Sequence, residues 1–383
     1  MTIYLDYNAT TPVDPSVLKA MLPYFVSRFG NPSSSHRYGQ DAKNAVEESR
    51  EKVANLISAD AGEIVFTSGG TESDNYAIIG LALAARRGRP EGRDIITSEV
   101  EHPAVLETCG YLHERFGFKV TYLPVDHYGS VNPEDLRQAL TDGTILITIM
   151  HANNEVGTIE PLEEIGQIAR EHGVPFHTDA AQSCGKIPVD VNKLKADLLT
   201  IAGHKMYAPK GIGALYVRKG VKLDSYIRGA GQEMGMRAGT ENVPYIVGLG
   251  AACEKAKRTL PSFGIRVAAL RDRLFAGISE GVGGGRVRLN GHPLQRLPNT
   301  LNISIRGTVG ETLLGRIPEL AASTGSACHS GTLEPSKVLL AMGLDESTAR
   351  GALRLSLGRW TDKEDIDRAS RLITGEAARY TAS

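Results

Sequence analysis

The stretch of residues 144–201 decides the fold, because it contains three apolar runs of strand length: Thr144-Ile-Leu-Ile-Thr-Ile-Met150, Val174-Pro-Phe-His-Thr-Asp179 and Asp197-Leu-Leu-Thr-Ile201. A segment that we expect to be a helix, residues 162–172, separates the first run from the second. Apolar strands that alternate with helices are typical of a mainly parallel sheet that is covered on both faces. The sequence therefore predicts an α/β fold.

The same alternation extends through the first 250 residues. Further strands are expected at 63–67, 94–97, 119–123 and 213–217, and further helices at 71–86, 103–116 and 133–140. Ligands of such sheets bind beyond the carboxyl ends of the strands, so the candidate site belongs there.

The pattern changes near Pro244, which indicates a second, smaller α+β domain. A helix is expected through Cys253 to about Arg258, then a glycine-rich loop at 281–285 and strands near 299–305 and 350–357. We expect a large domain at 14–256 and a small domain formed by 1–13 together with 257–383.

The charge is nearly balanced, with 43 Lys and Arg against 44 Asp and Glu in 383 residues, for a formal net charge of −1. This balance gives no indication of direct nucleic-acid binding or of attraction to an anionic membrane. The apolar run 77–85 is too short to cross a bilayer, and the first residues show no secretory signal, so we expect a cytoplasmic protein. The four cysteines, Cys109, Cys184, Cys253 and Cys328, form no Cys-x-x-Cys pair, and we expect neither a zinc site nor a disulfide framework.

Lys205 follows the apolar run 197–201, in the segment Gly203-His-Lys-Met-Tyr-Ala-Pro-Lys-Gly211. A lysine at the end of a buried strand is partly removed from water, which lowers its pKa and favours a Schiff base with an aldehyde. The alternative is a solvated lysine in a surface loop, which is the common situation for this residue type.

Polar groups that suit an aldehyde cofactor follow other strands. The run Gly69-Gly70-Thr71-Glu-Ser-Asp74 opens a helix, where free N–H groups and the helix dipole favour a phosphate, although a capping box of Thr71 and Asp74 is the alternative. Asp179 ends an apolar strand, where a buried carboxylate needs a cationic partner such as a protonated pyridine nitrogen. Its alternative role is to cap the following turn.

Three more side chains complete this group. His102 precedes a predicted helix and could stack on a planar ring and move protons, or simply cap the helix. Gln182 lies three residues after Asp179, and Asn154 follows the run 144–150, so both amides could reach a phenolic oxygen. Together these residues place a phosphate cradle, a stacking group, an anion for a pyridine nitrogen and a reactive amine on successive strand ends. That combination describes a site for pyridoxal 5′-phosphate (PLP).

Further motifs run nearly from end to end of the chain: Tyr4-Leu-Asp-Tyr-Asn-Ala-Thr-Thr11, Gly30-Asn-Pro-Ser-Ser34, Phe66-Thr-Ser-Gly-Gly-Thr-Glu72, Val100-Glu-His-Pro103, Ala152-Asn-Asn-Glu-Val-Gly157, His177-Thr-Asp-Ala-Ala-Gln182, Arg237-Ala-Gly-Thr-Glu-Asn242, Ser323-Thr-Gly-Ser-Ala-Cys328, Leu333-Glu-Pro-Ser336 and Leu353-Arg-Leu-Ser-Leu-Gly-Arg359. With these motifs the chain resembles the group I, NifS/IscS-like cysteine desulfurases, a branch of the class V aminotransferases among the fold-type I PLP enzymes. The resemblance implies a large domain on a mainly parallel seven-stranded sheet and a smaller α+β domain.

The resemblance also implies roles for individual residues. For the cofactor, it implies that Gly70, Thr71 and His204 bind the phosphate and that Lys205 is the point of covalent attachment. His102 would stack on the ring and transfer protons, and Asp179 would pair with the pyridine nitrogen. Asn154 and Gln182 would contact the phenolic oxygen. Thr240 would reach the phosphate of a partner subunit, which implies a homodimer. Ala202 departs from the pattern, since many relatives carry a serine there whose hydroxyl binds the phosphate.

For the substrate, the resemblance implies that Arg354 binds the carboxylate of L-cysteine as a bidentate fork, with Asn8 and Asn154 beside it. The alternative for Arg354 is a salt bridge at the edge of the core.

Cys328 lies among the small residues of Ala322-Ser-Thr-Gly-Ser-Ala-Cys-His-Ser-Gly-Thr332, which predict an exposed, mobile loop at about 322–333. A buried strand cysteine is the alternative. By the resemblance, Lys205 removes the α-proton, the Cys328 thiolate takes the sulfur as a persulfide, and L-alanine remains. The persulfide then passes to an acceptor of iron–sulfur cluster assembly or another thiolation pathway.

His329 would lower the pKa of the Cys328 thiol. Cys328 could also be a ligand of an iron–sulfur cluster shared with a partner, and we expect no other metal site. Because Ala327-Cys-His-Ser330 resembles selenocysteine lyases, that activity is the nearest alternative. An aminotransferase, which would need no thiol, and a scaffold that only binds partners are the more distant ones.

Overall fold

The computed structural model describes residues 2–88, 92–283, 285–325, 328–329 and 332–380, with the backbone alone for Cys328, His329, Thr332 and Leu333. Its main sheet has seven strands, and all neighbours are parallel except at β8, which is antiparallel to both of its neighbours. In spatial order the strands are β2 (Ile64–Thr67), β8 (Gly213–Val217), β7 (Leu198–Ala202), β6 (Phe176–Asp179), β5 (Thr144–Thr148), β3 (Asp94–Ser98) and β4 (Lys119–Leu123). The predicted α/β fold with a mainly parallel seven-stranded sheet is confirmed.

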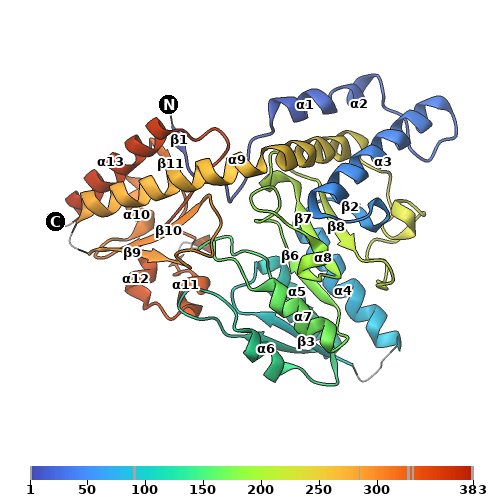
Figure 1. Cartoon of the computed structure of the whole chain (residues 1–383), viewed down its shortest axis with the longest axis horizontal. Coiled ribbons are helices and arrows are strands. Elements are labelled where there is room, and N and C mark those ends of the chain that lie inside the picture. Colours follow the sequence, from blue (N-terminus) through green and yellow to red (C-terminus); the bar gives the residue numbers. More distant parts are fainter. Residues whose placement is uncertain (1, 89–91, 284, 326–327, 330–331, 381–383) are drawn as a thin grey trace.

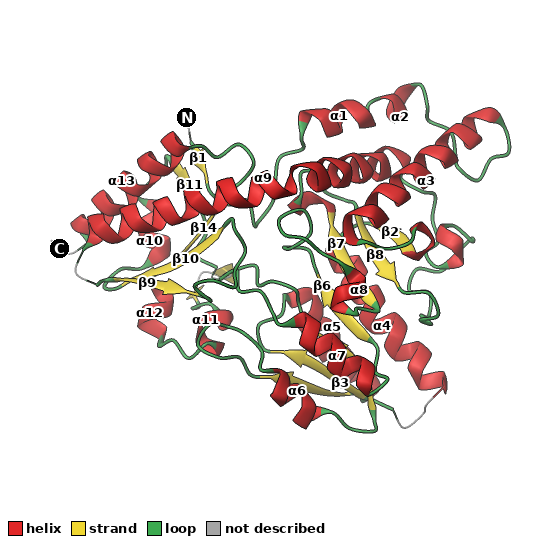
Figure 2. Cartoon of the chain, viewed as in Figure 1, coloured by secondary structure: helices red, strands yellow, loops and turns green. Residues whose placement is uncertain are grey.

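Helices cover both faces of this sheet, which explains why its central strands are buried throughout (Figure 2). The helices of the large sheet are α3 (Arg37–Ile57), α4 (Gly70–Gly88), α5 (Pro103–Phe116), α6 (Pro133–Ala139), α7 (Leu162–Glu171) and α8 (Val191–Leu194). Apolar side chains of α4 and α5 form one buried cluster with the sheet, and those of α3, α6, α7 and α8 form another.

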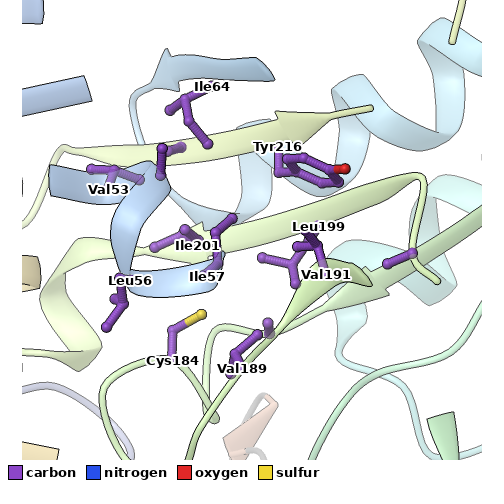
Figure 3. Close-up of a cluster of buried hydrophobic side chains, with 14 of the residues drawn as sticks. Val53, Leu56, Ile57, Ile64, Cys184, Val189, Val191, Leu199, Ile201 and Tyr216 are labelled. Atoms are coloured by element: carbon purple, nitrogen blue, oxygen red, sulfur yellow. The ribbon is translucent and has the colours of Figure 1, made fainter. Parts of the chain in front are cut away.

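Figure 3 shows part of the second cluster, in which Ile57 and Val53 of α3 lie over Ile201 and Ile64 of the sheet. The thiol of Cys184 is buried in the same cluster. Cys109 and Cys253 are buried as well, and burial raises the pKa of Cys109 to about 12. These three cysteines are therefore packing residues.

A separate three-stranded antiparallel sheet, in the order β14-β10-β9, lies in the C-terminal part of the chain. Its strands are β9 (Val287–Asn290), β10 (Thr300–Ile305) and β14 (Ala352–Ser356). Around it lie α10 (Gly310–Gly315), α11 (Lys337–Ala341), α12 (Glu346–Arg350), α13 (Lys363–Arg379) and the short pairs β1 (Ile3–Tyr4) with β11 (Leu320–Ala321) and β12 (Cys328–His329) with β13 (Thr332–Leu333). The predicted smaller α+β part is thus present.

The remaining elements are α1 (Pro15–Met21), α2 (Pro23–Val26) and the 3₁₀ turns η1 (Ala61–Glu63), η2 (Gly203–Lys205) and η3 (Glu233–Gly235).

One long helix, α9 (Val243–Val282), crosses from the large sheet to the small one (Figure 1). The prediction that this helix ends near Arg258 was wrong, because it continues through Pro261 for 40 residues in all. Its buried residues up to Ala256 belong to the cluster under the large sheet, and those from Val267 belong to the cluster of the small sheet. The domain limits at 13/14 and 256/257 stay a prediction.

Within the part of the chain that the structure describes, no helix has the length and apolar character needed to cross a membrane.

Candidate active site

Lys205 stands where β7 ends and the chain turns through η2. Its side chain is half-buried, and its Nζ donates to the carbonyl oxygens of Asn8 at 2.6 Å and Ala9 at 2.9 Å. Burial, followed by the positive charge of Arg354, lowers the pKa of Lys205 to about 8. The residue is therefore a partly desolvated amine with an accessible neutral form, and the alternative of a solvated surface lysine is wrong.

Asp179 is the last residue of the neighbouring strand β6 and is buried. Its Oδ1 accepts a hydrogen bond from the N–H of Ala181 at 2.8 Å. Burial raises the pKa of this carboxyl, while that hydrogen bond and the charges of His102 and Lys205 oppose the rise. A carboxylate in this position is stabilised by a cation, and a protonated pyridine nitrogen suits it.

His102 is the N-cap of α5, and its Nδ1 accepts from the N–H of Ala104 at 3.1 Å. The neutral ring therefore carries its proton on Nε2. Burial and the charge of Lys205 lower the pKa of His102, while the charge of Asp179 raises it. His102 is thus a helix cap, and it also lies within electrostatic reach of both central residues of the site.

The N-terminus of α4 adjoins the end of β7. A Cβ atom added to Gly70 would lie 3.2 Å from the Cβ of Ala202, so glycine permits this close approach. Thr71 of α4 and His102 line the same cavity of about 690 Å³. Thr71 and the predicted stacking group His102 therefore face one space, whereas Gly70 and Ala202 are not among the residues that line it.

Gln182, Asn154 and Arg354 meet at Asn8, whose side chain is buried. Gln182 Nε2 donates to the Asn8 carbonyl at 3.0 Å, and Asn8 Nδ2 donates to the Asn154 carbonyl at 3.1 Å. Arg354 donates to that same Asn154 carbonyl at 3.3 Å and to Asp6 Oδ1 at 2.9 Å. The salt-bridge alternative for Arg354 is thus realised in this structure, and its binding of a substrate carboxylate stays a prediction.

Asn8 is fully engaged by protein partners. Its Nδ2 also donates to Thr300 Oγ1 at 2.8 Å, and its Oδ1 accepts from Lys186 Nζ and Asn299 Nδ2, both at 3.0 Å. A substrate contact by Asn8 would require one of these bonds to break. Asp6 and Lys186 were missed as site residues, although each lies inside or beside a motif, in Tyr4-Leu-Asp6 and four residues after Gln182.

Three predicted residues are less closely tied to this centre. His204 Nδ1 lies 3.1 Å from Thr10 Oγ1, and burial with nearby lysine charges lowers the pKa of His204 to about 4, so its ring is neutral. Thr240 lines a different cavity, of about 100 Å³, so the structure does not bring it to Thr71 within one chain. The side chain of Cys328 lies outside the described structure, and so do the residues on which the expected mobility of its loop would be tested.

The geometry defines the class of protein: a mainly parallel α/β fold in which a buried carboxylate, a desolvated lysine and a helix N-terminus converge at the carboxyl ends of the strands, as in a fold-type I enzyme whose cofactor is PLP. The aminotransferase class-V family model matches residues 3–369, and the chain belongs to that family.

Named relatives and solved structures agree with this family. The chain is 52% identical over 373 residues to cysteine desulfurase IscS of Methanosarcina thermophila, covering 97% of this chain and 91% of the relative. It is 50% identical over 367 residues to that of Dictyoglomus turgidum, covering 95% and 92%. A solved NifS-like protein superposes with a TM-score of 0.91 at 38% identity, over 99% of this chain and 100% of that chain. A structure titled SspA in complex with cysteine gives 0.83 at 40% identity, over 94% and 100%.

Proposed function

We propose that this chain is a PLP-dependent cysteine desulfurase, which converts L-cysteine to L-alanine and leaves a persulfide on Cys328. The observation that carries the proposal is the half-buried Lys205 amine, with its pKa lowered to about 8, beside the buried Asp179 carboxylate. Relatives at about half identity named cysteine desulfurase support this activity over a selenocysteine lyase or an aminotransferase. The neighbour solved with cysteine supports L-cysteine as the substrate.

The side chains divide the work between binding and proton transfer. Arg354, held by Asp6 and the Asn154 carbonyl, would turn its guanidinium to the substrate carboxylate. Lys205 Nζ, released from the Asn8 and Ala9 carbonyls, would take the α-proton. His102, whose pKa is lowered by burial and whose Nδ1 accepts from Ala104 N–H, would offer Nε2–H as a proton donor.

The residues that would hold PLP are Lys205, Asp179, Gly70, Thr71, His204, Asn154 and Gln182. When bound, PLP would supply an electron sink. The Cys328 thiolate would then attack the substrate sulfur, so that an S–S bond forms as the carbon–sulfur bond breaks. The electron pair of that carbon–sulfur bond stays with the carbon skeleton, which takes up protons and leaves as L-alanine. The persulfide sulfur passes to an acceptor thiol.

The assembly and the destination of the sulfur belong to the same proposal. A homodimer would let Thr240 complete the phosphate site of the partner subunit, since Thr240 and Thr71 of one chain line different cavities. An acceptor in iron–sulfur cluster assembly is the destination that we propose first. Cytoplasmic location and the shared cluster ligand at Cys328 stay predictions from the sequence.

The test is single-turnover chemistry on the holoprotein. With L-cysteine and no reductant, we expect one equivalent of L-alanine per active site and one persulfide on Cys328, located by mass spectrometry of peptides. Cys328→Ser is expected to lower alanine formation at least 100-fold, whereas Cys253→Ala, which removes a buried thiol, is expected to keep the activity. Full turnover by Cys328→Ser would indicate an aminotransferase, and turnover of L-selenocysteine alone would indicate a selenocysteine lyase.

A further inference from the structure

Lys186 is a buried lysine whose hydrogen-bond partners are both uncharged. Only 5% of its surface is exposed, and its Nζ donates to Gln182 Oε1 at 2.6 Å and to Asn8 Oδ1 at 3.0 Å. Burial, followed by the positive charges of Lys205 and Arg354, lowers the pKa of Lys186 well below its ordinary value. Burying an ammonium group in this setting costs free energy, so the position is poorly explained by stability alone.

The contact with Lys186 fixes the orientation of the Gln182 amide. Nζ donates to Oε1, which is the atom of the Gln182 amide that can accept a hydrogen bond. The amide nitrogen Nε2 is therefore on the opposite side, where it donates to the Asn8 carbonyl at 3.0 Å. A rotated amide would lose the bond from Nζ to Oε1 and would place an oxygen against the Asn8 carbonyl, where the two oxygens repel each other.

The Asn8 carbonyl connects this pair to the reactive amine. It accepts from Gln182 Nε2 and also from Lys205 Nζ at 2.6 Å. Lys186, Gln182, Asn8 and Lys205 thus form a continuous series of three hydrogen bonds. Gln182 Nε2 has a second hydrogen, and this hydrogen is available to a ligand in the site.

We propose that Lys186 is a positioning residue for the cofactor, which holds the Gln182 amide so that its N–H, and not its oxygen, faces the phenolic oxygen of PLP. The inference rests on the proposed role of Gln182. It predicts an effect on the cofactor itself, since a donor to the phenolic oxygen stabilises its anionic form. The anionic form of the phenolic oxygen is favoured when the nitrogen that joins Lys205 to the cofactor has lost its proton. The Gln182 N–H donor therefore lowers the pH at which this nitrogen loses its proton.

A double-mutant cycle on the holoprotein tests the proposal, with the visible absorbance of the bound cofactor followed against pH. Lys186→Met and Gln182→Met are each expected to raise the midpoint of the absorbance change by about one pH unit, as for the loss of one hydrogen bond to a charged group. The double variant is expected to shift no further than either single variant. Lys193→Met, at an exposed lysine, is the matched control and is expected to leave the midpoint in place.

Two results would overturn the proposal. If Lys186→Met leaves the midpoint unchanged and only lowers the melting temperature, the residue is structural. If it shifts the midpoint equally with Gln182 present and absent, it acts as a direct charge and not through the amide. Lys186→Gln, with a shorter polar side chain, repeats the test if the Met variant does not fold. The visible absorbance band reports whether PLP is bound, and alanine formation reports the proposed activity. A protein that lacks the band or forms no alanine is therefore distinguished from one in which Lys186→Met leaves the midpoint of the absorbance change in place.

Discussion

At the scale of single residues, the charge of Lys205 controls when the site can react. The neutral amine attacks an aldehyde, so we expect the rate at which apoprotein captures PLP to rise with pH through a midpoint near 8, and not near the ordinary lysine value of 10.5. Arg354→Met removes a positive charge that lowers this pKa, and should move the midpoint upward by about 1 unit. Stopped-flow absorbance measures the rate, with Nα-acetyllysine alongside to correct for the titration of PLP. An unchanged midpoint in Arg354→Met would contradict the assignment.

At the scale of elements, α9 carries a proline that its surroundings tolerate. Pro261 lies in the helix interior on an exposed side, where it removes one backbone N–H donor and crowds the preceding turn. Pro261→Ala should therefore stabilise the protein by about 1–3 kcal/mol, less than the full helix penalty because the unfolded chain also gains freedom. Urea unfolding of the apoprotein measures the change. Leu260→Ala, one residue earlier in the helix, should show no comparable gain.

The same helix shows where the sequence is insufficient. The central strand Thr144–Thr148 could be predicted to within two residues, because burial on both faces favours apolar side chains. Phe176–Asp179 could be predicted equally well, although three of its four buried residues are polar. The end of α9 could not, since packing against α13 and the small sheet carries the helix through Pro261. In the candidate site, the places of Lys205 and Asp179 at strand ends could be predicted from the sequence. The bonds from Gln182 and Lys186 to Asn8 could not, because they join residues 174 and 178 positions apart.

At the scale of the whole molecule, Asn8 joins the two sheets. Its side chain bonds to Lys186 and Asn154 on one side and to Asn299 and Thr300 on the other. Asn8→Ala leaves several of these buried groups unpaired, and should lower the free energy of unfolding by about 2–4 kcal/mol in urea titrations of the apoprotein. Asn44→Ala, at an exposed position of α3, is the control and should stay within about 0.5 kcal/mol of the parent. If Asn8→Ala lowered the free energy of unfolding no more than Asn44→Ala does, residues other than Asn8 would hold the two sheets together.

The N-terminal segment also has a consequence for synthesis on the ribosome. Ile3 pairs with Leu320, and the N–H of Asn8 donates to Ser356 Oγ, 348 residues later. Residues 3–8 are thus made long before Leu320 and Ser356, which hold them in place, while the strands of the large sheet are complete by Val217. A nascent chain can form its main sheet early, yet the carbonyls that accept from Lys205 gain a fixed place only after Ser356 has been made. Premature termination before Ser356 would therefore disturb residues 3–8 as well as the part that is missing, and with them the surroundings of Lys205.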